Sequence, residues 1–118
     1  MDTMEKIELI RQEFIKNRKI LSAVGDETRQ NIITELLGCC NGIRVGEITS
    51  RTHLSRPAVS HHLRILLDAN LVTLEKQGTR NYYSLNIGEE FQGLLNLIRH
   101  IAEFKIARES GQLTGMPK

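Results

Sequence analysis

The stretch Ser55-Arg56-Pro57-Ala58-Val59-Ser60-His61-His62-Leu63-Arg64-Ile65-Leu66-Leu67 predicts a short helix with one apolar side and one polar side. Ser55 is a good N-cap, and Pro57 in the first turn loses no hydrogen bond because its missing N–H has no partner there. The inward stripe consists of Val59, Leu63, Leu66 and Leu67. The helix is therefore expected to begin at Ser55 and to end near Ala69.

The polar side of this helix suits DNA recognition. The major groove admits one helix, and the residues near its N-terminus approach the base edges. Arginine donates to guanine or to phosphate, serine and histidine reach a base or a phosphate oxygen, and alanine contacts a thymine methyl group. We expect His62 to pack or to cap. The candidate DNA contacts on the helix are Ser55, Arg56, Pro57, Ala58, Ser60, His61 and Arg64.

The flanking segments predict a winged helix-turn-helix. Residues 44–52 are expected to form a short helix with Val45 and Ile48 buried, and only a tight turn separates it from Ser55. From Val72 the pattern alternates, and two β-rich runs flank a polar turn that contains glycine, which predicts a hairpin over about 72–86. Its tip would lie near the phosphate backbone or the minor groove. The candidate DNA contacts there are Lys76, Gln77, Thr79, Arg80 and Asn81.

Three longer helices are predicted outside this motif. One covers about 3–21, with its stripe at Met4, Ile7, Ile10, Phe14 and Leu21. Another follows the N-cap Asp26, with Ile32, Ile33, Leu36 and Leu37 facing inward, and the last covers about 89–109. The expected fold class is mainly α with a two-stranded β-hairpin wing, in the order α-α-α-α-β-β-α, in a single domain over 1–118.

Composition and charge fit a small DNA-binding protein. The 118 residues contain no Trp and 4% aromatics, so the core depends on Leu, Ile and Val. The net charge is +2, but residues 44–81 hold six Lys/Arg and three Asp/Glu. No apolar run suggests a membrane span or a secretory signal, and the adjacent Cys39 and Cys40 suggest a reducing compartment. A cytoplasmic protein without a membrane partner is expected.

Three stretches resemble the ArsR (ArsR/SmtB) family of bacterial repressors: 23–29 (AVGDETR), 54–66 (LSRPAVSHHLRIL) and 78–85 (GTRNYYSL). The resemblance implies a homodimer joined through the first and last helices, which binds an inverted-repeat operator in double-stranded DNA and is released by an inducer. Both terminal helices also carry more apolar surface than one thin layer covers. The predicted dimer contacts are Ile7, Ile10, Phe14, Phe91, Leu94, Leu95, Ile98 and Ile101.

Many members of this family sense metals. The Cys-x-Cys pair of one family site falls on Arg44 and Gly46, which do not ligate metals. A second site uses pairs at the two ends of the last helix. The end pair matches His100 and Glu103, while the start pair falls on about Ile87 and Glu89. The weak metal candidates are therefore His100, Glu103, Glu89, Cys39 and Cys40. No cofactor is expected, and the inducer stays open between a metal, a non-metal and none.

Two other functions compete with DNA recognition. A winged helix can serve as a protein-interaction module without sequence-specific DNA binding, because a fold does not determine a function. An enzyme is not expected, because the chain has no phosphate-binding glycine loop and no Ser or Cys in a convincing nucleophile context.

Overall fold

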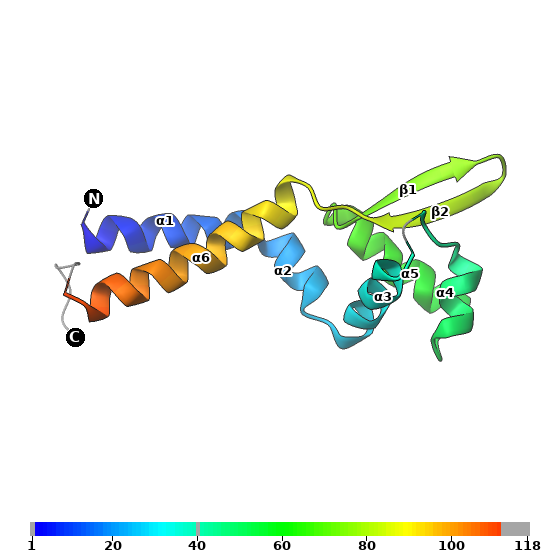
Figure 1. The fold of residues 1–118 in the computed structure, drawn as a ribbon, viewed down its shortest axis with the longest axis horizontal. Helices are drawn as coiled ribbons and strands as arrows, with labels where there is room; N and C mark the ends of the chain where they lie inside the picture. Colours follow the sequence, from blue (N-terminus) through cyan, green and yellow to red (C-terminus); the bar gives the residue numbers. More distant parts are fainter. Residues whose placement is uncertain (1, 40, 112–118) are drawn as a thin grey trace.

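The structure is a computed structural model that describes residues 2–39 and 41–111, and Figure 1 shows its elongated shape of 58 × 26 × 21 Å. Its elements in chain order are α1 (Thr3–Lys16), α2 (Arg18–Val24), α3 (Glu27–Leu37), α4 (Val45–Arg51), α5 (Arg56–Asp68), β1 (Val72–Gln77), β2 (Arg80–Leu85) and α6 (Glu89–Glu109). The winged helix-turn-helix predicted from the sequence is confirmed.

The molecule has two parts, which Figure 1 separates clearly. The winged half consists of α3, α4, α5 and the hairpin. The helical arm consists of α1 and α6, which lie side by side and extend away from the hairpin. Helix α2 lies between the two parts and contacts α1, α3, α5 and α6. Within the described residues, no helix is long and apolar enough to cross a bilayer.

The core lies in the winged half and in α2. Side chains from four helices have no exposed surface there, because they close on one another from all sides: Ala23, Ile32, Ile48, Val59, Leu63 and Leu66. The loop residue Ile43 is equally buried and exchanges two backbone hydrogen bonds with Tyr83 of β2, at 2.9 and 2.8 Å. This bridge joins the loop after α3 to the wing. No pattern in the sequence predicted it.

The single helix expected over 3–21 is wrong, because the chain breaks at Asn17 into α1 and α2. Asn17 has φ −102° and ψ 14°, and its side-chain amide donates to the carbonyl of Glu13 at 2.7 Å. Helix α6 passes this break at Gly93, where an added Cβ would lie 2.9 Å from Asn17 Oδ1. The break lets α2 turn toward α5 while α1 stays beside α6.

One expected core residue is also wrong. Leu37, the last residue of α3, is 66% exposed. The buried stripe of α3 follows Ile32 and Leu36, four residues apart on one face. Leu37 lies about 100° further round the helix and therefore faces solvent.

Candidate nucleic-acid interface

Helix α5 has the orientation that the sequence predicts. The Ser55 hydroxyl accepts a hydrogen bond from the Ala58 N–H at 3.2 Å, which caps the N-terminus and leaves the first turn at the surface. Val59, Leu63 and Leu66 face inward and are fully buried. Of the predicted contacts, Ala58 is half-buried and the others are exposed: Ser55, Arg56, Pro57, Ser60, His61 and Arg64.

The hairpin presents its predicted tip to solvent. Strands β1 and β2 are antiparallel, with Gln77 opposite Arg80 and Lys76 opposite Asn81. Gly78 starts the two-residue turn with φ 67°, a conformation that glycine adopts without the steric cost of a Cβ. All five predicted contacts of the tip are exposed: Lys76, Gln77, Thr79, Arg80 and Asn81.

The cations of this surface are available to an outside ligand. In the part of the chain that the structure describes, no ion pair or side-chain hydrogen bond involves Arg56, Arg64, Lys76 or Arg80. By contrast, Arg29 and Arg51 each contact acidic groups. A guanidinium or ammonium group without a protein acceptor keeps its donors for an outside anion such as phosphate.

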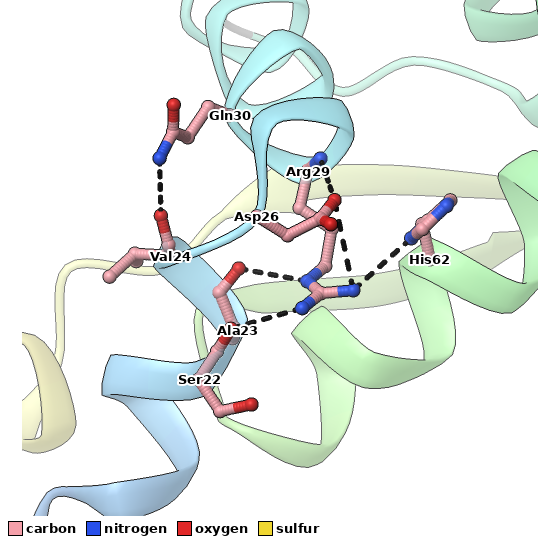
Figure 2. A network of polar contacts seen from close by, with 7 residues as sticks. All are labelled: Ser22, Ala23, Val24, Asp26, Arg29, Gln30 and His62. Carbon is pink, nitrogen blue, oxygen red and sulfur yellow. Dashed lines mark hydrogen bonds and ion pairs between the residues drawn. The ribbon is translucent and has the colours of Figure 1, made fainter.

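A network behind α5, shown in Figure 2, was not predicted from the sequence because its members are distant in the chain. The guanidinium of Arg29 donates to the carbonyls of Ala23 and Ser22 at 2.9 and 3.0 Å, and to Nδ1 of His62 at 3.3 Å. The Asp26 carboxylate accepts from the Arg29 N–H at 3.0 Å and caps α3. This backbone hydrogen bond, with the nearby positive charge of Arg29, lowers the pKa of Asp26 below its ordinary value. His62 is half-buried and packs against Arg29, in line with the expectation that it packs or caps.

The weak metal candidates that the structure describes do not form a metal site within one chain. Both carboxylate oxygens of Glu13 lie near Nδ1 of His100, at 2.7 and 2.9 Å, and Glu103 lies 3.7 Å from Arg99. Glu89, eleven residues before His100 on the same helix, lies about 16 Å away along the helix axis. Among the described residues, no three His, Cys, Asp or Glu side chains form a metal-binding group.

Cys39 takes part in a polar contact with the helix-turn-helix. Its half-buried sulfur accepts a hydrogen bond from Nη1 of Arg51 at 3.5 Å, and the same guanidinium lies 3.6 Å from Glu35 and 4.0 Å from Glu47. The contact with Cys39, together with the two carboxylates, raises the pKa of Arg51 above its ordinary value. Cys40 lies outside the described residues.

The helical arm leaves apolar side chains in solvent. A groove of about 940 Å³ runs between α1 and α6. Of the predicted dimer contacts, four are exposed, namely Phe14, Leu95, Ile98 and Ile101. Ile7 and Ile10 are half-buried, while Phe91 and Leu94 pack against the core of their own chain. Four more large apolar residues of these helices are exposed and were not among the predicted contacts: Met4, Leu9, Ile15 and Ile106.

Comparison with known proteins places this architecture in a family. The model of the family described as "Bacterial regulatory protein, arsR family" matches residues 26–73. The chain is 41% identical over 92 residues to the Arsenical resistance operon repressor of Bacillus subtilis (strain 168), covering 77% of this chain and 81% of that protein. It is 33% identical over 82 residues to the Transcriptional repressor SdpR of the same organism, covering 67% and 89%.

A solved structure of a family member has the same fold. An ArsR-like transcriptional regulator from Rhodococcus sp. RHA1 superposes with a TM-score of 0.72 at 26% identity, covering 84% of this chain and 89% of that one. The family and these relatives are regulators of transcription and not enzymes, as the sequence predicted. The chain therefore belongs to the ArsR family of bacterial DNA-binding regulatory proteins.

Proposed function

We propose that the protein is a homodimeric transcriptional repressor that acts in the cytoplasm and binds an inverted-repeat operator through α5 and the hairpin. The observation that carries the proposal is the pairing of an exposed polar face on α5 with four cations that have no partner among the described residues, Arg56, Arg64, Lys76 and Arg80. Neutral polar residues at the helix N-terminus would read bases, and the cations would contact phosphates.

The apolar arm supports the dimer. Ile98 and Ile106 are 56% and 66% exposed although they sit on a helix that otherwise packs against α1. Large apolar side chains exposed along one arm of a small protein indicate an interface. A second copy related by a two-fold axis would cover it and would present two copies of α5, which fit half-sites one turn of DNA apart, roughly 34 Å.

The names of the relatives support repression. Two relatives are named as repressors of transcription or of an operon, and a third, 33% identical over 94 residues, is named the Transcriptional activator HlyU of Vibrio cholerae. A repressor occupies an operator that overlaps the promoter, whereas an activator binds beside it. A reporter gene under the native promoter separates the two: its expression rises without the protein if the protein represses.

The DNA contacts are tested by removing two arginines either from α5 or from the helical arm. We expect Arg56→Ala with Arg64→Ala to weaken binding to a duplex from the protein's own promoter at least tenfold. The slope of log K against log salt should also fall by about 0.9 for each phosphate that the variant no longer neutralises. The matched control is Arg11→Ala with Arg99→Ala, which removes two exposed arginines from the helical arm. Equal binding by both double variants would contradict the proposal.

An inducer that weakens DNA binding belongs to the proposal. Because the relative with 41% identity is named for arsenical resistance, a panel of soft metals and metalloids is the first set to test. Cys39 is the thiol that the described residues offer, and it touches α4 of the helix-turn-helix through Arg51. Release of DNA by one of these ions in the wild type but not in Cys39→Ser would identify the ligand. Release in both would exclude Cys39.

A further inference from the structure

Arg29 joins three helices through one side chain. Its Nε and Nη2 groups donate to the carbonyls of Ala23 and Ser22, which lie at the end of α2, and its Nη1 group donates to His62 in the middle of α5. Its own backbone N–H is bound by Asp26 at the start of α3. The side chain is 12% exposed, so these contacts are sheltered from water. Figure 2 shows the guanidinium at the centre of the three helices.

The chemistry of this contact defines the state of His62. A guanidinium only donates hydrogen bonds, so Nδ1 of His62 is the acceptor in this contact. The ring is therefore held toward Arg29, on the side of α5 that includes the half-buried Ala58 and Ile65. The preceding residue, His61, lies about 100° round the helix from His62 and is exposed. The buried stripe of Val59, Leu63 and Leu66 gives α5 its orientation, and the contact with Arg29 adds a polar restraint to that orientation.

The position of α2 connects this contact to the helical arm. Helix α2 touches both helices of the arm and also α5. Arg29 binds the carbonyl end of α2, where the last backbone acceptors lack the N–H four residues on that they would meet inside a helix. It binds α5 with the same planar group. A hydrogen-bonded connection therefore runs from the helix that meets the arm to the helix that faces DNA.

We infer that Arg29 and His62 are positioning residues for DNA recognition: Arg29, anchored on the end of α2, holds His62 and so presents the outer face of α5 at the correct rotation. The inference rests on the proposed function, because it takes α5 as the helix that reads DNA. It assigns no direct DNA contact to either residue. Their loss should reduce the preference for the operator and leave general attraction to DNA intact, since the surface cations remain.

The test compares two replacements of His62. Asparagine places an acceptor oxygen where Nδ1 stands, whereas leucine fills similar space and has no acceptor. We expect His62→Leu to lower operator affinity about tenfold, as loss of a hydrogen bond to a charged group would, and His62→Asn to stay within about threefold of the wild type. Binding to an unrelated duplex should be equal in all three proteins. Fluorescence anisotropy with the two duplexes measures both quantities.

Gln30→Ala is the matched control. Gln30 also binds the end of α2, through the carbonyl of Val24 at 2.8 Å, and this bond does not involve α5. Its loss should leave operator affinity unchanged. Wild-type operator affinity in His62→Leu would overturn the inference, and so would His62→Asn binding as weakly as His62→Leu, because the ring itself would then matter. A wild-type protein that binds no duplex would instead overturn the proposed function.

Discussion

The winged half and the helical arm have the same apolar periodicity, but only the winged half buries its apolar stripe within one chain. In the winged half the stripe of α5 packs against α2, α3 and β1, and Leu63 has no exposed surface. In the arm, α6 has the same kind of stripe, yet of its described residues Leu97 alone is fully buried, while Ile98 beside it is 56% exposed. The winged half therefore buries its apolar stripe within one chain, whereas the arm leaves apolar side chains exposed, as an interface does before its partner binds.

The largest expected effect is on stability, when one residue of each apolar stripe is truncated to alanine. Leu63→Ala should lower the free energy of unfolding by about 2–5 kcal/mol, because it leaves a cavity in a closed core. This loss should be the same at every protein concentration. Ile98→Ala should have a smaller effect that vanishes as the protein is diluted, because Ile98 is covered only in a dimer. Urea denaturation over a hundredfold range of concentration separates the two; parallel behaviour would refute the contrast.

The next test places a charge on the arm. Ile98→Glu should weaken dimerisation about a hundredfold, or about 2.7 kcal/mol, since a carboxylate would enter an apolar contact. Sedimentation equilibrium gives the dimer constant, and circular dichroism checks that the helices remain. Leu37→Glu is the control, because Leu37 is 66% exposed but lies in the winged half. A dimer that tolerates Ile98→Glu as well as Leu37→Glu would place the interface elsewhere.

A moderate effect is expected at the start of α5. Ser55→Ala removes the hydroxyl that caps the Ala58 N–H and should cost about 1 kcal/mol of unfolding free energy. Ser60→Ala, in the exposed interior of the same helix, should be neutral within about 0.5 kcal/mol. Thermal unfolding of the two variants measures the difference. Equal midpoints would mean that the cap adds nothing.

The smallest effect concerns pH. Because the pKa of Asp26 is lowered in the folded chain, its ionised form contributes stability above its ordinary pKa, and this contribution disappears as the pH falls through the folded value. Asp26→Asn keeps a capping side chain but removes the charge. The variant should be less stable than the wild type at pH 7, and the gap should close below about pH 4. Unfolding midpoints over a pH series test this, and a gap independent of pH would contradict it.

Much of the fold was predictable because its signals are local. The caps at Asp26 and Ser55 act on N–H groups three residues away, and both helices begin where the sequence predicts. The two strands pair across the turn at Gly78, as the alternation predicted. The exposed side chains of α5 and of the hairpin tip follow from these elements, since an apolar stripe on one side leaves the other to solvent. The residues that contact DNA stay a prediction.

By itself the sequence determined the helix-turn-helix, the wing and the polar outer face of α5, because each depends on residues within a turn or a hairpin of one another. The tertiary structure alone decided the break at Asn17, the contact of Arg29 with His62 and the pairing of Glu13 with His100. The last two contacts join residues 33 and 87 positions apart. Such contacts form only after the helices have packed, so no local period or cap encodes them.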